Sequence, residues 1–147
     1  MAPQRARKKI FVMDDDPEMQ IFLANLLNSA GYRAIIAEGG KDTLQQIVEA
    51  GPVVIILCMM KYRDRKRELY RSLKGDANLK QIPVILLSNI ERRTFFHYQK
   101  FKTHPMGASL PEPEDYFVKP LEADDLLRSI HQLTRQTASQ SDEERLS

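Results

Sequence analysis

Five residues whose side chains could take part in phosphate, metal or thiol chemistry each stand just after a short apolar run. They are Asp14, Asp15, Cys58, Ser88 and Lys119. Adjacent carboxylates suit a hard cation such as Mg²⁺, which takes oxygen ligands. A cation, a lysine and a hydroxyl together can neutralise and hydrogen-bond a phosphoryl group. These residue types therefore indicate phosphoryl chemistry, provided that the fold brings them together.

Five apolar runs alternate with amphipathic stretches, and they predict strands. The runs cover residues 10–13, 33–37, 53–57, 83–87 and 116–118. The third and fourth are continuously apolar, which is typical of central parallel strands covered on both faces. Parallel strands need crossover connections, and these are right-handed. We therefore expect an α/β fold, an open parallel sheet between two layers of helices, with its site at the carboxyl ends of the strands.

The stretches between the runs carry helix start and stop signals. Asp16 and Pro17 give an N-cap followed by proline in the first turn. Gly31 stands where a left-handed C-terminal cap belongs, and Gly51 with Pro52 stops the second helix. The apolar spacing predicts helices over residues 17–30, 41–50, 65–74, the first part of 91–102, and 121–133.

Length and composition favour one domain. The chain has 147 residues, of which 42% are hydrophobic and 29% charged. We expect a flexible basic arm over residues 1–8, a folded domain over 9–135, and a disordered polar tail or frayed helix end over 136–147. The net charge of +2 does not argue for a nucleic-acid binder. The single cysteine and the lack of a signal-peptide core or membrane span predict a cytoplasmic protein.

Three segments, FVMDDDPEM, PVILLSN and DYFVKP, occur in this order on the strand–helix alternation. In these segments, and over about residues 8–135, the chain resembles the CheY-like receiver domain of bacterial response regulators, which act in two-component signal transduction and phosphorelays. The resemblance implies a flavodoxin-like three-layer sandwich with a five-stranded parallel sheet in the order 2-1-3-4-5.

The resemblance also implies roles for single residues. Asp14 and Asp15 would be the metal-binding acid pair, and the Ser88 hydroxyl would contact the phosphoryl group. Lys119 would pair with that group. Tyr116 would be the aromatic residue that swings inward when the family's switch fires.

The chain departs from the family at the phosphate acceptor, an aspartate at the end of strand three that a histidine kinase phosphorylates. An ungapped alignment places Cys58 there, and a slip of one residue would place Leu57 there. Neither residue is a carboxylate, so the usual acyl phosphate cannot form. One of three metal-binding carboxylates is also lost, so no cofactor is required and Mg²⁺ binding stays open. The usual Pro-Gly turn after the acceptor is replaced by residues 61–66.

We therefore expect an atypical receiver, or pseudo-receiver, that is not an enzyme and acts as a protein-interaction module. Its partner would be a kinase-like or downstream signalling protein, or a second copy of the chain, bound near residues 90–118. Nucleic acid and membrane are not expected partners. The basic segment 61–74 could dock an acidic partner, but a solvated helix face is the preferred interpretation.

Two alternatives remain open at this point. Cys58 could be a redox switch if nearby positive charge lowered its pKa, but a buried residue that fills the space of the lost aspartate is the simpler interpretation. Asp14 and Asp16 also match the Asp-x-Asp motif of haloacid-dehalogenase-type phosphatases. However, Asp124 and Asp125 open a helix rather than end an apolar strand, so the last acid pair of that family is missing.

Overall fold

The computed structural model describes residues 7–38, 42–59, 66–91, 93–94 and 111–146, with side chains up to residue 135. Its five strands are β1 (Lys9–Met13), β2 (Arg33–Ile36), β3 (Val54–Cys58), β4 (Val84–Ser88) and β5 (Asp115–Val118). All four pairings are parallel, and the order is β2-β1-β3-β4-β5. The predicted sheet and its order are confirmed, and the bounds of each strand lie within a residue of the predicted run.

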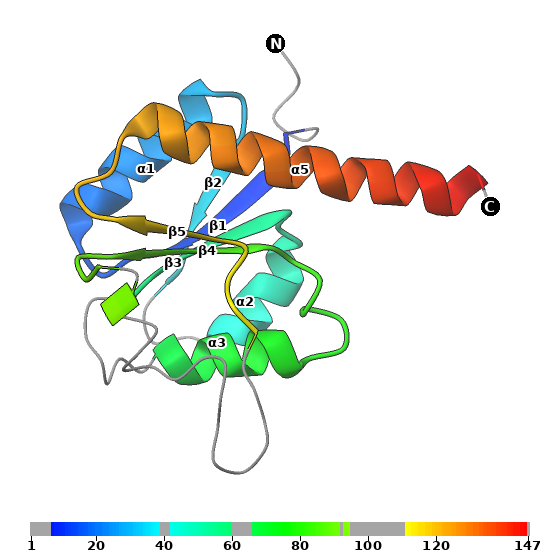
Figure 1. Ribbon diagram of the computed structural model, residues 1–147, viewed down its shortest axis with the longest axis horizontal. Helices are drawn as coiled ribbons and strands as arrows, with labels where there is room; N and C mark the ends of the chain where they lie inside the picture. Colours follow the sequence, from blue (N-terminus) through cyan, green and yellow to red (C-terminus); the bar gives the residue numbers. More distant parts are fainter. Residues whose placement is uncertain (1–6, 39–41, 60–65, 92, 95–110, 147) are drawn as a thin grey trace.

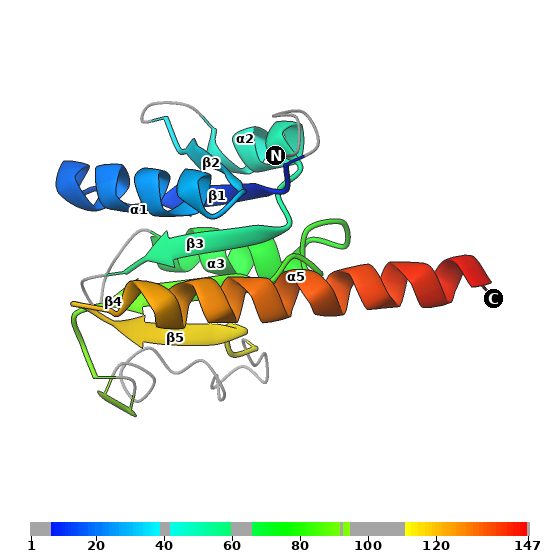
Figure 2. The same cartoon turned by 90° about the horizontal axis from the view of Figure 1, so that it is seen from above.

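The described helices form a layer on each face of the sheet (Figures 1 and 2). They are α1 (Pro17–Ser29), α2 (Thr43–Ala50), α3 (Lys66–Gly75) and α5 (Ala123–Leu146). Leu23 and Leu27 of α1 and Leu126 of α5 belong to one buried cluster, whereas Ile47 of α2 and Tyr70 of α3 belong to the other. The three-layer sandwich predicted from the sequence is therefore present.

The central strands supply both clusters because successive side chains of a strand point to opposite faces. Ile55 and Leu57 of β3 pack with α2 and α3, while Ile56 and Cys58 pack on the side of α1 and α5. This alternation explains why β3 and β4 are buried throughout. It also fixes which residue of β3 faces which layer.

Local capping places the helices as the sequence predicts. The Asp16 carboxylate accepts a hydrogen bond from the amide of Glu18 (3.1 Å), which caps α1. At the end of α2, Gly51 has a φ of 61°, the left-handed conformation that glycine adopts at low cost.

The last helix is longer than its apolar spacing indicates. Helix α5 runs to Leu146, so it includes residues 136–146, for which the sequence predicts a disordered tail or a frayed helix end. These residues include glutamine, alanine, glutamate and arginine, which are good helix formers, and they extend a helix that is already nucleated. Most of the helix predicted over residues 91–102 lies outside the described residues.

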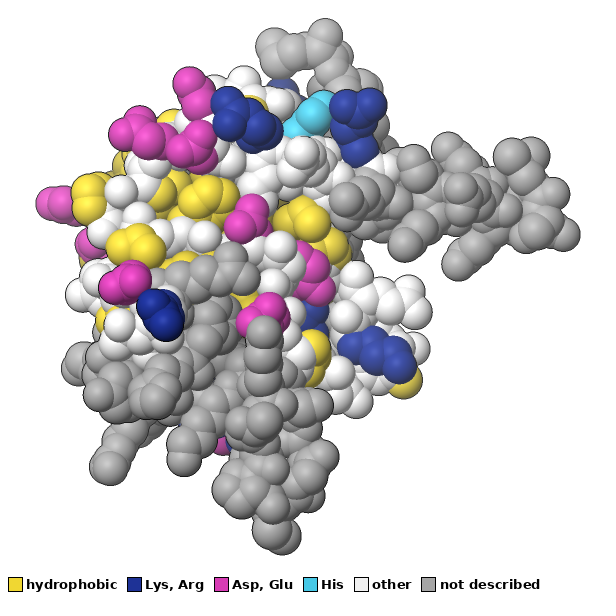
Figure 3. All heavy atoms as spheres, in the orientation of Figure 1, with side chains coloured by type: hydrophobic (Ala, Val, Ile, Leu, Met, Phe, Trp, Pro, Cys, Tyr) yellow, Lys and Arg dark blue, Asp and Glu magenta, His cyan; other side chains and the backbone are white. Residues whose placement is uncertain are grey.

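The surface of the described residues has a few exposed apolar side chains and no candidate for a membrane span. Ile21, Phe22, Val48 and Val118 are the large hydrophobic residues exposed there. On the face that Figure 3 shows, hydrophobic side chains gather next to acidic side chains. No helix among the described residues is long and apolar enough to cross a bilayer.

Candidate functional site

Strand register brings the predicted site residues to one edge of the sheet. Met13 pairs with Leu57, so Asp14 and Cys58 emerge side by side. Ser88 pairs with Val118, so Ser88 and Lys119 emerge together on the next strands. Because all these strands are parallel, their carboxyl ends form one edge, and four strands contribute to it.

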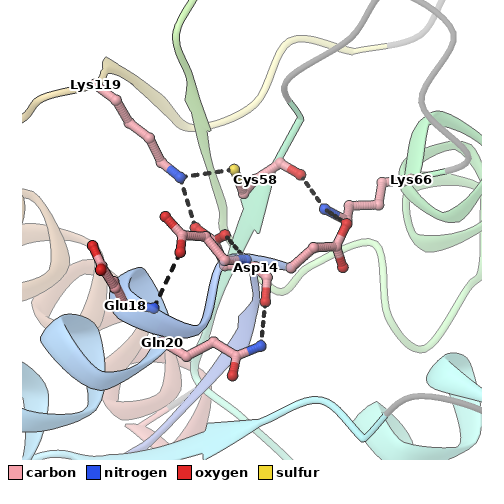
Figure 4. A network of polar contacts seen from close by, with 8 residues as sticks. Asp14, Glu18, Gln20, Cys58, Lys66 and Lys119 are labelled. Atoms are coloured by element: carbon pink, nitrogen blue, oxygen red, sulfur yellow. Dashed lines mark hydrogen bonds and ion pairs between the residues drawn. The ribbon is translucent and has the colours of Figure 1, made fainter.

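Lys119 joins two of the strand ends (Figure 4). Its ammonium group lies 2.8 Å from Asp14 Oδ2 and donates a hydrogen bond to Cys58 Sγ at 3.1 Å. The Asp14 side chain is buried, and its Oδ1 accepts the amide of Asp16 at 2.9 Å. Lys119 is therefore held by Asp14 and by Cys58, the residue at the acceptor position.

A second lysine, Lys66, reaches the same edge from the start of α3. Its Nζ donates to the backbone carbonyl of Cys58 at 2.7 Å and lies 3.0 Å from Asp15 Oδ2. Figure 4 shows Lys66 and Lys119 approaching Cys58 from opposite sides. The Lys66 side chain is only 9% exposed, whereas the Asp15 side chain is 90% exposed. The two lysines thus match the two acids in charge.

Sequence reasoning missed Lys66, because it lies in a basic run interpreted as a solvated helix face. In the structure both Lys66 and Lys74 of that run turn inward, and the Lys74 side chain is only 5% exposed. The structure therefore corrects the predicted solvated face at these two positions. An available clue was that Lys66 ends the segment that replaces the Pro-Gly turn.

The Cys58 thiol is buried and its pKa is raised. Burial is the largest cause, because it disfavours the thiolate, and the negative charge of Asp14 adds to it. The hydrogen bond from Lys119 and the charges of Lys119 and Lys66 act in the opposite direction without reversing the shift. The thiol is therefore neutral near pH 7, the opposite of what a reactive cysteine needs.

The pKa of Lys119 is also raised. Burial alone would lower it, but hydrogen bonds to Asp14 and Cys58, together with their charges, outweigh that effect. Lys119 is therefore an ammonium at neutral pH and a donor to both groups. It cannot act as a base there.

Ser88 and Tyr116 form a second group at the same edge, linked through Ile90. The amide of Ile90 donates to Ser88 Oγ at 3.1 Å, and the Tyr116 hydroxyl donates to the carbonyl of Ile90 at 2.6 Å. Tyr116 is buried, so its ring is turned inward. The amide of Lys119 donates to the Ser88 carbonyl at 2.7 Å, which ties this group to the lysine.

The carboxylates at this edge already have positively charged partners. One oxygen of Asp14 and one of Asp15 each contact a lysine ammonium group, which lies where a metal ion would otherwise supply the positive charge. The third position holds a thiol, which is a soft ligand that Mg²⁺ does not prefer. Among the described residues, no group of three or more His, Cys, Asp or Glu side chains could hold a metal ion.

The structure also tests two alternatives from the sequence: Leu57 in place of Cys58 at the acceptor position, and Asp16 as a partner of Asp14 in a phosphatase motif. Leu57 is fully buried in the cluster with α2 and α3, so Cys58 is the residue of β3 that contacts Lys119. Asp16 caps α1 and does not join the ionic contacts of Asp14 with Lys119.

The chain was compared with protein-family models, with curated proteins and with solved structures. No protein-family model matches the chain. The phosphate regulon transcriptional regulatory protein PhoB of Pseudomonas aeruginosa is 28% identical over 130 residues, 88% of this chain and 53% of that protein. Protein PilH of the same organism is 26% identical over 123 residues, 84% of this chain and 94% of PilH. The chain therefore spans about half of one relative and nearly all of the other.

A solved structure gives the same fold. The CheY-like response regulator receiver domain protein of Methanospirillum hungatei superposes with a TM-score of 0.70 at 18% identity, covering 92% of this chain and 99% of that one. This likeness shows the fold. In its sheet order and over most of its length, the chain is similar to response regulators and to CheY-like receiver domains.

Proposed function

We propose that this receiver works in bacterial signal transduction as a protein-interaction module that is not switched by an aspartyl phosphate. One observation carries the proposal: the residue at the acceptor position is the buried, neutral thiol of Cys58, held by Lys119. A thiol cannot form the acyl phosphate on which the family's switch depends.

The second group at the edge supports a protein-binding role. Tyr116 is turned inward and hydrogen-bonded, and Ser88 is tied to Ile90. By the family's logic, the inward aromatic residue belongs to the switched state. We infer that the chain holds this arrangement without phosphorylation and so presents one constant surface to its partner.

The proposed partner is a protein, either a kinase-like or downstream signalling protein or a second copy of the chain. Most of the surface predicted to bind it, near residues 90–118, lies outside the described residues. Val118, which ends β5 beside that segment, is 42% exposed. Isolated exposed hydrophobic side chains are common, so Val118 marks a position to test rather than a patch.

The geometry supports neither redox switching at Cys58 nor a haloacid-dehalogenase-type phosphatase. Redox switching at Cys58 needs a lowered pKa and solvent access, and the thiol has a raised pKa and is buried. A haloacid-dehalogenase-type phosphatase needs Asp14 and Asp16 to act together, and Asp16 instead caps α1. We therefore propose a non-enzymatic role.

Labelling with radioactive acetyl phosphate in the presence of Mg²⁺ tests the proposal. The wild-type chain should stay unlabelled under conditions that label a conventional receiver to completion. A hydroxylamine-labile label, which marks an acyl phosphate, would refute it. The variant Cys58→Ser keeps the size of the side chain and controls for labelling at a thiol.

Crosslinking tests the binding role separately. A photoreactive amino acid at position 118 should give one crosslinked product in cells, either with another protein or with a second copy of the chain. The same amino acid at Val48, which is also exposed but lies on α2, is the matched control. Equal crosslinking from both positions would contradict a specific surface at β5.

A further inference from the structure

The charged side chain of Lys66 lies where a positive charge is destabilising unless it is paired with negative groups. Lys66 is the first residue of α3, where the helix dipole disfavours a positive charge. Its side chain is also buried, and a buried ammonium group must be paired or neutralised. Its partners include a carboxylate oxygen of Asp15 and the backbone carbonyl oxygen of Cys58.

These two partners are hard oxygen donors of the kind that Mg²⁺ takes. The neighbouring carboxylate of Asp14 completes the acid pair, and it is already matched by Lys119. Without Lys66, the edge would hold Asp14 and Asp15 with only one cation between them. Lys66 therefore supplies the second positive charge from within the chain.

We propose that Lys66 is a built-in cation that replaces a divalent metal ion at this edge of the sheet and makes the receiver independent of Mg²⁺. The ammonium group holds the start of α3 against the ends of β1 and β3, as a bound ion would. This proposal extends the proposed function but does not depend on it. Its test involves no phosphoryl transfer, so either can fail alone.

The test is a Mg²⁺ titration followed by thermal unfolding. For the wild-type chain, 10 mM MgCl₂ should leave the midpoint unchanged relative to NaCl of equal ionic strength. Lys66→Gln removes the charge and frees Asp15 and the Cys58 carbonyl. Its midpoint should be lower than that of the wild type, and MgCl₂ should raise it by about 3 °C, the shift expected for millimolar affinity in a domain of this size.

Two variants make the result specific to the position. Lys74→Gln removes a buried, paired lysine at the other end of the same helix, and its lowered midpoint should not respond to MgCl₂. Lys66→Arg keeps the charge and should stay insensitive to MgCl₂. If Lys66→Gln fails to fold without MgCl₂, then refolding that requires MgCl₂ but not NaCl supports the proposal equally.

Mn²⁺ provides a direct measurement of the same site. In Lys66→Gln, submillimolar Mn²⁺ should broaden the amide NMR signals of Asp14, Asp15 and Cys58 before those elsewhere, whereas the wild-type signals should stay sharp. The proposal is overturned if the wild type responds to Mg²⁺ or Mn²⁺ as strongly as Lys66→Gln, or if Lys66→Gln responds to neither.

Discussion

The two ends of α3 each place a buried lysine against a carboxylate, yet they serve different purposes. At the end of the helix, Lys74 lies 2.6 Å from Glu114 Oε1, and Glu114 Oε2 accepts the amide of Val84 at 2.7 Å. At its start, Lys66 contacts Asp15 and a carbonyl oxygen. The first contact joins α3 to the beginnings of β4 and β5. The second lies at the carboxyl edge, where such sheets hold their sites.

A lysine–carboxylate pair by itself therefore says little about function, and its surroundings decide. Glu114 contacts one lysine and one strand amide within the chain, and the Tyr70 hydroxyl donates a hydrogen bond to the carbonyl of Pro111 nearby. At the start of α3, by contrast, Asp14 and Asp15 are adjacent carboxylates. Each is paired with a lysine from a distant part of the chain, Lys119 and Lys66 respectively. The contacts of Lys74 and Glu114 at the end of α3 form a structural clamp, whereas the contacts of Lys66 at its start belong to the candidate functional site.

The largest effect should come from the clamp. Glu114→Ala removes the partner of the buried Lys74 ammonium and the acceptor of the Val84 amide, which should lower the free energy of unfolding by about 3 kcal/mol. Urea unfolding at pH 7, with and without MgCl₂, measures it, and MgCl₂ should make no difference. Glu49→Ala, on the exposed side of α2, should stay within about 0.5 kcal/mol of the wild type. Equal losses of stability for Glu114→Ala and Glu49→Ala would show that the contacts of Glu114 do not stabilise the fold.

Asp14→Asn tests the charge balance at the carboxyl edge of the sheet through the sign of the change in stability. With Lys119 and Lys66 in place, losing the Asp14 charge leaves Lys119 without its anion, so the variant should be less stable by about 2 kcal/mol. In an acid pair without such cations, the same change would relieve repulsion and stabilise the chain. Urea unfolding without divalent ions decides between them. A stabilised Asp14→Asn would show that the lysines do not compensate the acids.

The sequence predicts the sheet well because period and composition are local properties. Continuous apolar runs such as 53–57 specify buried parallel strands, and Asp16, Pro17 and Gly51 mark helix ends through their own conformational preferences. The acid pair, Cys58, Ser88 and Lys119 are likewise found from their positions after the strands. Their convergence follows from the topology alone.

Lys66 was not predictable in the same way, because its role depends on a contact between α3 and the end of β1. A lysine in the run 61–74 looks like its neighbours in sequence, and helical periodicity does not reveal which of them turns inward. Only the position of Asp15 across the sheet edge distinguishes Lys66. Charges that balance across distant segments are a tertiary property, and the sequence gives only their number.

Tyr116→Phe measures the second group of the carboxyl edge. The change removes the hydrogen bond to the Ile90 carbonyl and keeps the buried ring, so the loss should be about 1 kcal/mol. Urea unfolding gives this value. Tyr32→Phe, on a half-buried tyrosine elsewhere, is the matched control and should cost less. An unchanged Tyr116→Phe would mean that the inward ring is held by packing alone, which would separate it from Ser88 and the rest of the edge.

The smallest predicted effect on stability concerns Cys58, and it appears only at alkaline pH. Its pKa is raised above the usual 9.0 by burial, so the folded chain holds the thiol proton more tightly than the unfolded chain. The stability this provides is complete below pH 9 and is lost as the pH rises through the folded value. Lys119 shifts in the same direction, but its loss begins only near its usual 10.5.

The thermal midpoint of the wild type should therefore fall as the pH rises above 9, and that of Cys58→Ala should fall less over the same interval. Alkylation by iodoacetamide in the folded chain should stay slow at pH 8 and rise only above pH 9. A midpoint that falls equally in both chains, or rapid alkylation at pH 7, would mean that the thiol ionises as readily as in water. In that case Lys119 and Lys66 would dominate over burial, and the carboxyl edge of the sheet would hold a reactive thiolate instead of a neutral side chain that fills the place of an aspartate.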